Sequence, residues 1–363
     1  MLKKIWIKDF RNLKEAVYTF DPGKNVFIFG ENNQGKTNFL EAINLIGTAL
    51  SVKDNHIKNL ISFDKNECFI GGDFQEEDIL LRIYLKIVAD GKKFLVINNK
   101  PVKKISYLKE NFFIEYLSIE NIRYFIENSE YRRKSFDKFL SIYDIKYFQL
   151  IRNYHKLIKQ KNILLKQRGK YHDLQIFNLK IIELADFIVS KRKSIIKIMI
   201  ERFNTILINF NKLKDFRFDI DYQLYQDNNS ETEYKDYLAG KLEKNYQKEI
   251  DIGYSLFGPH RDDFKIYLNE KELSLFYSRG INKLITLLFR YVEITLLREK
   301  YHYSPIILFD DVLTELDAEI KQEIVNIYEA DTQLFYTSID KEDKSFFKKV
   351  VTYQMINGEL KNV

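Results

Sequence analysis

A glycine-bounded loop carries the residues of this chain that are best suited to bind phosphate. The loop runs from Gly30 to Thr37 and ends in Gly35-Lys36-Thr37, which matches the GxxxxGK[ST] pattern of a phosphate-binding loop. Its glycines let the backbone turn tightly, so that successive N–H groups point at phosphate oxygens. Lys36 adds a charge that reaches the β- and γ-phosphates, and the Thr37 hydroxyl is a ligand for Mg²⁺. The pattern predicts a nucleotide site, and the alternative is a chance glycine-rich turn.

The segments on either side of this loop have the periodicities that a phosphate loop requires. Val26 to Phe29 is uniformly apolar and predicts a buried strand, and Asn38 to Ile43 carries an apolar helical period. A helix that starts at the loop adds its positive end to the field at the phosphates. This context disfavours a chance turn. The loop residues expected to contact the nucleotide are Gly30, Glu31, Asn32, Asn33, Gln34, Gly35, Lys36, Thr37 and Asn38.

A second acidic motif follows a buried strand far downstream. Ile306 to Phe309 is apolar and is followed by Asp310 and Asp311, the pattern of a Walker B strand. We expect Asp310 to lie near an Mg²⁺ held by Thr37, and Asp311 to polarise the attacking water as general base. An acidic residue after a buried strand is often simply the first residue of a loop. The phosphate loop upstream favours a catalytic role for these two aspartates instead. The predicted catalytic residues are Lys36, Asp310 and Asp311, and the predicted metal ligands are Thr37 and Asp310.

The remaining pattern predicts a mixed α/β chain whose site is assembled from its two ends. Ile151 to Gln167 and Leu174 to Phe203 read as an antiparallel helical hairpin broken near Gly169, within a helical stretch that begins at about Ser106. A polar loop is expected from Gln226 to Tyr237, and a buried helix from Tyr277 to about Arg298. The predicted strands are Leu2–Lys8, Ala16–Phe20, Val26–Phe29, Cys68–Phe74, Ile79–Val88, Lys93–Ile97, Phe216–Leu224, Phe264–Leu268, Ile306–Phe309, Leu334–Thr337 and Lys349–Tyr353.

Composition places few limits on function. Among 363 residues, 58 Lys and Arg stand against 52 Asp and Glu, a net charge of +6 that alone says little about partners. One cysteine, Cys68, excludes a disulfide framework and fits a reducing compartment. The segment from Met1 to Lys8 carries charges where a signal peptide has an apolar core, and no apolar run approaches the ~20 residues of a membrane span. We therefore expect a cytoplasmic protein without a membrane partner.

One region is much more basic than the rest. Residues 131–170 hold twelve Lys and Arg but only two acidic residues, Asp137 and Asp144. A solvated helix face and a DNA-contacting surface both explain this run. The aromatic residues between the charges either stack on bases or pack in the core: Tyr131, Phe136, Tyr143, Tyr147 and Tyr154.

These motifs together resemble the RecF family, bacterial recombination-mediator ATPases related to the heads of SMC proteins. The most family-specific string is Gly258-Pro259-His260-Arg261-Asp262-Asp263, whereas the phosphate loop alone fits many NTPases. The other segments that carry the resemblance are Phe10-Arg11-Asn12, Leu40-Glu41-Ala42-Ile43, Arg132-Arg133 with Phe136-Asp137, Ser278-Arg279-Gly280, Asp310-Asp311-Val312 and Glu315-Leu316-Asp317.

The resemblance implies an ABC/SMC-type P-loop ATPase head with mixed β-sheet lobes and an inserted α-helical arm or lid. Residues 1–105 and 208–363 would form the two parts of the head, and 106–207 the arm. Two copies would dimerise around two ATP molecules. Ser278 and Gly280 of the signature motif would reach the γ-phosphate held by the partner subunit. Residues Leu313 to Asp317 would contact the partner subunit itself. ATP hydrolysis would be slow and DNA-stimulated, acting as a switch.

The resemblance also implies a role in recombinational repair of single-strand gaps, in replication restart and in the SOS response. The expected partners are gapped DNA with single/double-strand junctions, RecR and RecO, with support of RecA loading. An effector or defence ATPase on the same head is the alternative, although too few residues follow Asp317 for an added nuclease domain. A transporter ATPase subunit fits less well, because it would have a compact head without the helical arm. A structural chromosome protein also fits less well, because it would need long heptad arms, which this sequence lacks.

The chain departs from the family pattern in a few places. After Gly280 the family usually has Gln, whereas this chain has Ile281, which affects the predicted contact with the γ-phosphate. Lys53 stands where Arg is common, and residues 117–122 lack the usual Pro. The role of His260 stays open from sequence: it lies near the nucleotide, at a contact between the lobes, or as the cap of a turn. The role of Arg261 is open too, and Arg11 and Asn12 lie either near the nucleotide or in a simple turn.

Overall fold

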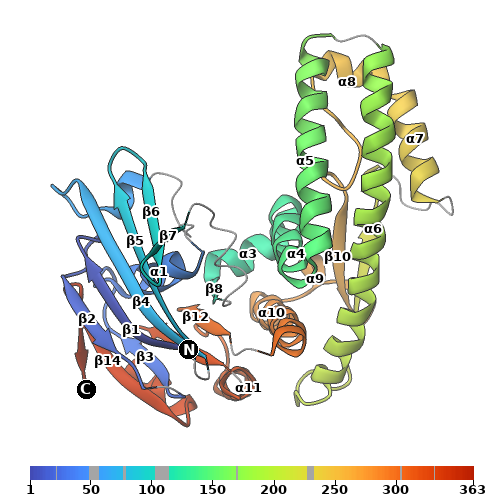
Figure 1. The fold of residues 1–363 in the computed structure, drawn as a ribbon. Coiled ribbons are helices and arrows are strands. Elements are labelled where there is room, and N and C mark those ends of the chain that lie inside the picture. The colour runs from blue at the N-terminus through green and yellow to red at the C-terminus, as the bar shows by residue number, and fades with distance from the viewer. Residues whose placement is uncertain are drawn as a thin grey trace. The chain divides into compact units, whose positions relative to one another are not determined.

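A computed structural model gives the fold of the chain (Figure 1). It describes residues 1–21, 23–48, 57–76, 79–102, 114–168, 171–226, 233–302, 305–330 and 332–363. The chain forms two compact units, one from residues 1–122 and 298–363 and the other from 123–297. We call them the first and second unit. The expected domain boundaries after residues 105 and 207 stay a prediction; the first falls within 103–113, outside the described residues, as do Lys53 and Gly169.

The first unit is built on two six-stranded sheets. The antiparallel sheet has the order β2-β1-β4-β5-β6-β7, and the second sheet has the order β15-β14-β3-β13-β12-β8, parallel except for β15. The bounds of the antiparallel strands are β1 Leu2–Lys8, β2 Ala16–Thr19, β4 Glu67–Glu76, β5 Ile79–Val88, β6 Lys93–Ile97 and β7 Lys100–Val102. Those of the second sheet are β3 Asn25–Phe29, β8 Ile114–Ser118, β12 Ile306–Asp310, β13 Gln333–Ser338, β14 Val350–Ile356 and β15 Glu359–Asn362.

Helix α1 (Lys36–Thr48) lies between these sheets and contacts strands of both. Its apolar residues join one core with those of the strands, including Leu40, Ile43 and Ile46. On the parallel sheet, α11 (Ala318–Glu329) places Tyr328 against Phe309 of β12, with ring centroids 4.8 Å apart. Every residue of β12 is therefore buried, as its continuous apolar run predicts for a central parallel strand.

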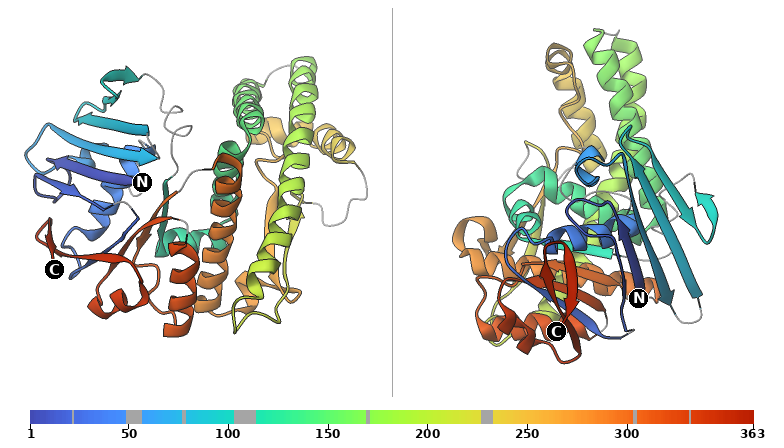
Figure 2. Two further views of the ribbon diagram at one scale, coloured as in Figure 1. Left: turned by 60° about the horizontal axis from the view of Figure 1, so that its bottom comes forward. Right: turned by 90° about the vertical axis from the view of Figure 1, so that its left-hand side faces the viewer.

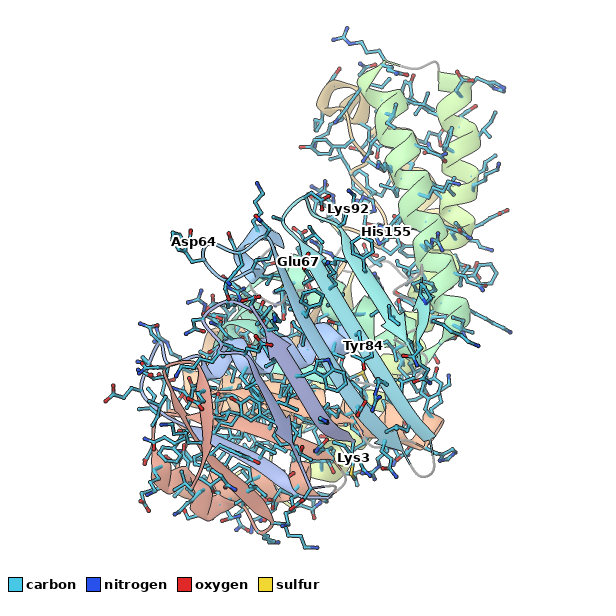
Figure 3. All side chains as sticks on the ribbon, turned by 60° about the vertical axis from the view of Figure 1, so that its left-hand side comes forward. Lys3, Asp64, Glu67, Tyr84, Lys92 and His155 are labelled. Carbon is cyan, nitrogen blue, oxygen red and sulfur yellow. The ribbon has the colours of Figure 1, made fainter. Side chains whose placement is uncertain are left out.

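The outer face of the antiparallel sheet is formed by alternate side chains of its strands (Figure 3). Tyr84 of β5 stands on this face, and its ring centroid lies 5.0 Å from that of Trp6. Gly71 lies under the indole, since a Cβ atom there would come within 2.1 Å of it. Arg82, Asp73, Lys86 and Glu67 form two ion pairs across the strands on this face. Such cross-strand pairs stabilise a sheet through contacts between side chains of neighbouring strands on one face.

The second unit contains a long helical hairpin. Helices α5 (Ile145–Lys166) and α6 (Tyr171–Leu207) lie side by side (Figures 1 and 2). Asp144 caps α5, because its carboxylate accepts hydrogen bonds from the backbone N–H groups of Lys146 and Tyr147. The remaining elements of this unit are α4 Ser129–Tyr143, β9 Phe218–Gln223, α7 Tyr234–Lys244, α8 Tyr246–Ile252, β10 Asp263–Leu268, β11 Lys271–Glu272 and α9 Leu273–Phe276. Two further helices, α3 (Ile119–Glu127) and α10 (Arg279–Tyr301), each run across a boundary between the units.

Two sequence expectations are wrong. The helical stretch expected from Ser106 includes a strand, β8, because Ile114 to Ser118 pair in register with Ile306 to Asp310 of β12. The polar loop expected from Gln226 to Tyr237 gives way at Tyr234 to α7, which packs on α6. In both cases tertiary contacts decide the local structure over the local pattern.

The aromatic residues of the basic region belong mainly to the core. Phe136, Tyr147 and Tyr154 are at most 1% exposed, so the core alternative is confirmed for these three. Cys68 is also buried, and burial raises the pKa of its thiol to about 12, which leaves it unreactive. None of the helices in the described ranges has both the length and the apolar character needed to cross a membrane.

Candidate nucleotide site

The parallel sheet brings the two predicted motifs together at one edge. The phosphate loop follows β3, and Asp310 ends β12; β13 lies between these strands and pairs in parallel with each. Because the carboxyl ends of parallel strands meet at the same edge, residues distant in sequence become neighbours there. The Thr37 hydroxyl accordingly donates a hydrogen bond of 2.9 Å to Asp310 Oδ1. The expectation that the site is assembled from both ends of the chain is confirmed.

The glycines of the loop are required by close contacts. A Cβ atom at Gly30 would lie 2.6 Å from the carbonyl oxygen of Met355, and one at Gly35 would lie 3.0 Å from Leu13 Cδ2. Gly35 also has a φ of +114°, which side chains rarely adopt. The loop backbone therefore runs too close to Met355 and Leu13 for a side chain at either glycine. This backbone follows the sharp course that directs N–H groups into one concavity.

Lys36 lies in the concavity of the loop. Its ammonium donates hydrogen bonds to the carbonyl oxygens of Gly30 (2.6 Å) and Glu31 (3.0 Å). Burial lowers the pKa of Lys36, while the nearby carboxylates of Asp311 and Asp310 act in the opposite direction. A desolvated ammonium that lines the pocket beside the loop is suited to attract phosphate oxygens.

Three hydroxyl groups fix the carboxylate of Asp310. Oδ1 accepts hydrogen bonds from Thr37 and, at 3.0 Å, from Thr337; Oδ2 accepts one of 2.6 Å from the Tyr116 hydroxyl. Burial, together with the Asp310 charge, raises the pKa of Tyr116, so this phenol is a donor at every physiological pH. Sequence reasoning missed both Tyr116 and Thr337, since each lies on a different strand and neither belongs to a motif. Strand pairing alone positions them.

Asp311 has an unusual backbone conformation. Its φ is +55°, a left-handed value that is uncommon for a residue other than glycine. The Thr337 hydroxyl oxygen accepts a hydrogen bond of 3.2 Å from the Asp311 N–H and so supports this turn. Strained backbone of this kind persists where the surrounding structure holds it, often at functional sites. The turn directs Asp311 to the same pocket as Lys36.

A pocket of about 570 Å³ lies over the loop. This volume is in the range that accommodates a cofactor-sized ligand. The residues that line it are Asn12, Asn32, Asn33, Gly35, Lys36, Thr37, Asn38 and Asp311.

The oxygen donors at this pocket suit Mg²⁺. Thr37 and Asp310 present a hydroxyl and a carboxylate side by side, which are the hard ligands that Mg²⁺ prefers. The part of the chain that the structure describes contains no group of three or more His, Cys, Asp or Glu side chains able to hold a metal ion. Two protein oxygens fit an ion that takes its remaining ligands from phosphate and water, as Mg²⁺ does in nucleotide sites.

The open question about Arg11 and Asn12 is answered differently for each. Arg11 forms a two-point ion pair with the buried carboxylate of Glu41 in α1, at 2.5 and 3.1 Å. Asn12 lines the pocket, donates to the carbonyl oxygen of Asn33 at 3.3 Å and accepts from the amide of Asn38 at 2.7 Å. Arg11 therefore anchors the helix, whereas Asn12 bridges the middle of the phosphate loop and the first turn of α1.

Ser278 and Gly280 lie in the second unit, at the start of α10. The Ser278 side-chain oxygen accepts a hydrogen bond from the Ile281 N–H at 3.4 Å, and the serine is exposed. Around Gly280, the nearest atom to an added Cβ would be Ser278 Oγ, at 3.9 Å. The chain's own packing thus does not require glycine at this position. The predicted nucleotide contacts of Ser278 and Gly280 stay predictions.

The string from Gly258 to Asp263 forms a closed network within the second unit. The Asp262 carboxylate is 0% exposed and accepts hydrogen bonds from the Tyr225 N–H and from the hydroxyls of Tyr222 and Tyr234. Asp263 forms a two-point ion pair with Arg132, at 2.7 and 3.1 Å. These contacts tie together elements of one unit.

Arg192 completes this network. It is 2% exposed, donates to the carbonyl oxygen of Pro259 at 2.8 Å and binds both carboxylate oxygens of Asp137 at 2.8 Å. Asp137 also accepts a very short hydrogen bond from the Tyr147 hydroxyl. Arg192 and Asp137 thus neutralise each other, as buried charges require.

His260 is part of the same closed region. Its Nδ1 lies 2.5 Å from the Tyr154 hydroxyl, and its Nε2 lies 3.3 Å from the carbonyl oxygen of Ser255. Since a carbonyl only accepts, Nε2 carries the hydrogen and Nδ1 accepts from Tyr154. Burial lowers the pKa of His260 to about 3. A neutral, fully bonded imidazole supports the structural alternative for this residue.

Comparison with known proteins agrees with this geometry. The family model "RecF/RecN/SMC N terminal domain" matches residues 1–361. The curated "DNA replication and repair protein RecF" of Clostridium beijerinckii is 30% identical over 365 residues, covering 99% of this chain and 98% of the relative. The same-named protein of Clostridium botulinum strain Eklund 17B is 29% identical over 363 residues, with 99% of each covered.

Solved structures extend the agreement to the fold. One described as "Structure of the recombination mediator protein RecF-ATP in RecFOR pathway" superposes with a TM-score of 0.86 at 27% identity, covering 100% of this chain and 97% of the other. An Smc head bound to the C-winged helix domain of ScpA has a TM-score of 0.60 at 15% identity, covering 100% and 97%. The predicted α/β fold of the ABC/SMC type, with mixed sheets and helices, is confirmed, and this chain belongs to the RecF family.

Proposed function

We propose that this chain is an ATP-binding protein of DNA replication and repair that uses ATP as a switch for binding DNA. Its curated relatives are named for replication and repair, and a solved relative of the RecFOR pathway is described with ATP. The observation that carries the proposal is the pocket of the first unit. There Lys36, Thr37 and Asp311 face one space, with Asp310 hydrogen-bonded to Thr37 at its floor.

The residues of the pocket divide the chemistry among them. The amides from Gly30 to Asn38 and the Lys36 ammonium bind the phosphates, and Thr37 and Asp310 hold Mg²⁺. When bound, Mg²⁺ neutralises charge on the β- and γ-phosphates. Asp311, held in its left-handed turn, accepts the proton of the attacking water. The phosphates therefore meet positive groups on one side and a base on the other.

The proposed switch is a homodimer closed by ATP. Ser278 and Gly280 are accessible at a helix start whose packing does not require glycine. They contact the γ-phosphate held by the partner subunit, and residues Leu313 to Asp317 contact that subunit. A ligand that bridges two copies favours the closed state by its differential affinity, and hydrolysis releases it. Ile281 occupies a position where a side-chain amide would add a contact, so hydrolysis is slow.

The proposed cellular role follows the family. The closed dimer binds gapped DNA at junctions of single and double strands, in the cytoplasm, and cooperates with RecR and RecO to support RecA loading. In this role hydrolysis is stimulated by DNA. It serves recombinational repair of gaps, replication restart and the SOS response.

A binding experiment tests this proposal. Affinity is measured for gapped, fully duplex and single-stranded DNA with ATP and with ADP, using the wild type and Lys36→Met. We expect ATP-dependent binding that prefers the gapped substrate and is lost in the variant, because Lys36 provides a charge at the phosphates.

Two other outcomes contradict it. Tight DNA binding that is indifferent to nucleotide and to Lys36 would mean that the pocket is not the switch. ATP binding without DNA binding under any condition would favour an effector ATPase built on the same head.

A further inference from the structure

Helix α5 carries cations along its whole length and no carboxylate. Between Ile145 and Lys166 there are six Lys or Arg and no Asp or Glu. Lys161 differs from the others, because it is buried and pairs with Glu249 at 2.6 Å. The other five are exposed, and we call them the α5 basic face: Lys146, Arg152, Lys156, Lys159 and Lys166.

The helical period places most of these cations on one side. At about 100° per residue, Arg152, Lys156, Lys159 and Lys166 fall within about 80° around the axis, whereas Lys146 lies about 80° outside this sector. The buried residues, including Tyr147, Tyr154 and Ile158, occupy the opposite side. From Arg152 to Lys166 the cations extend over about 21 Å of the helix, at a rise of about 1.5 Å per residue. These exposed side chains therefore form a track along one side of α5.

These side chains are not neutralised within the described residues. None of the five forms a salt bridge with a described carboxylate. Lys134, Lys191 and Lys235, which are exposed in the same unit, do form one, with Glu130, Asp144 and Asp186 respectively. Helix α6, the other half of the hairpin, mixes both signs, with Asp173, Glu183, Asp186 and Glu201 among its basic residues. A face that serves solubility carries interspersed signs. The single sign on α5 calls for an anionic ligand.

The chemistry of the face selects among nucleic-acid ligands. Proteins that bind single strands provide exposed aromatic rings on which bases stack. On α5 the rings of Tyr147 and Tyr154 are fully buried. The exposed positions between the cations are Gln149, Asn153, His155, Gln160 and Ile163, and the His155 imidazole packs edge-on against the Tyr154 ring, with centroids 5.7 Å apart. Flexible cations spaced along one line suit a regular row of phosphates. Contacts to phosphates position a protein on the duplex but do not read its base sequence.

We infer that the α5 basic face binds the phosphate backbone of duplex DNA, independently of its sequence. The inference rests on the proposed DNA-binding function and assigns the duplex side of a junction to this helix. About 21 Å corresponds to roughly six phosphates of one strand at 3.4 Å each, enough for the four aligned cations. Each phosphate contact contributes about 0.9 to the slope of log K against log salt.

The test compares two charge-matched variants of the full-length protein. In one, Arg152, Lys156 and Lys159 are changed to Gln; in the control, Lys180, Lys197 and Lys244, exposed on α6 and α7, are changed to Gln. Affinity for duplex, gapped and single-stranded DNA is measured with ATP over a range of salt, and ATP binding is measured separately. A third variant, Arg152→Lys with Lys156→Arg and Lys159→Arg, keeps the charge.

We expect the α5 variant to bind duplex and gapped DNA at least about tenfold more weakly, with a salt slope shallower by about two to three. ATP binding and the melting temperature stay unchanged because all three side chains are exposed. The control and the charge-keeping variant bind as the wild type does.

Three results of the DNA-binding measurements overturn the inference. They are an unchanged salt slope in the α5 variant, an equal loss in the α6/α7 control, and a loss confined to single-stranded DNA. Binding of the wild type to vesicles of anionic lipid, lost in the α5 variant while duplex binding is kept, also overturns it. Failure of the proposed function is distinct, because there the wild type itself binds no DNA with ATP.

Discussion

The nucleotide site of the first unit and the Asp262 network of the second use the same kinds of groups in opposite ways. Each combines a nearly buried cation, two carboxylates and tyrosine or threonine hydroxyls. In the network, Arg192 binds Asp137 at two points and also donates to Pro259, while Asp262 accepts three hydrogen bonds. In the nucleotide site, Lys36 donates to two carbonyl oxygens of its own loop and faces a pocket.

The difference separates stability from function. A closed network satisfies its charges internally and contributes to holding one unit together, so it has nothing left for a ligand. An open site presents a desolvated ammonium and an Asp311 with strained backbone to a ligand, at some cost to stability. The phosphate loop and the string from Gly258 to Asp263 both stand out in the sequence. A family-specific motif is therefore not by itself evidence of a chemical site.

The largest expected effect comes from opening the network. Arg192→Met removes the partner of Asp137 in a buried region and should lower the free energy of unfolding by about 3–5 kcal/mol. Thermal or urea unfolding of the purified protein measures this. The control is Lys191→Met, next in sequence but exposed and paired on the surface with Asp144, for which we expect a change below about 1 kcal/mol. Equal losses in the two variants would contradict the idea of a structural centre.

The corresponding change in the nucleotide site should have the opposite profile. Lys36→Met removes an ammonium whose pKa burial lowers, so the stability of the nucleotide-free protein should fall by less than about 1 kcal/mol or rise. ATP binding should weaken by about 100-fold or more, because the charge at the phosphates is lost. Unfolding without nucleotide and titration with a fluorescent ATP analogue measure the two quantities. A strong loss of stability would mean that the two regions do not differ.

The sequence was most informative where one local pattern determines the structure. The phosphate loop, its strand and helix, and the strand before Asp310 follow from residue type and period alone, as do β5 and β6 to the residue. Tyr116 and Thr337 could not be predicted, because only the pairing of β8, β12 and β13 brings their hydroxyls to Asp310. The predictions of a helix at β8 and a loop at α7 were wrong for the same reason, since burial against β12 and α6 decides the conformation of these segments.

His260 offers a test of the network through pH. Its pKa falls from the ordinary 6.5 to about 3 in the folded chain, so the unfolded chain binds the proton more readily between these values. The stability contributed by the neutral imidazole is complete above about pH 6.5 and is lost as the pH falls toward 3, at up to about 1.4 kcal/mol per pH unit.

The comparison with His260→Gln isolates this contribution from other titrating groups, such as Asp262, whose pKa burial raises. Between pH 7 and about pH 5.5 the wild type should lose about 1.4 kcal/mol more than the variant. Urea unfolding at each pH gives both values, with exposed His172→Gln as the control. Parallel pH profiles for wild type and His260→Gln would show that the imidazole is not the titrating group.

The smallest expected effect concerns Tyr116, which positions Asp310 through a 2.6 Å hydrogen bond. In Tyr116→Phe the Asp310 carboxylate keeps its hydrogen bonds from the Thr37 and Thr337 hydroxyls. It loses the donor that fixes Oδ2, so it is less well oriented toward Mg²⁺. The Mg²⁺ concentration for half-maximal ATP binding should rise about three- to tenfold, while ATP affinity in EDTA stays the same. Tyr353→Phe, whose hydroxyl forms no hydrogen bond with described residues, should match the wild type. A general packing defect would weaken binding with and without Mg²⁺, whereas positioning of the carboxylate changes the Mg²⁺-dependent part alone.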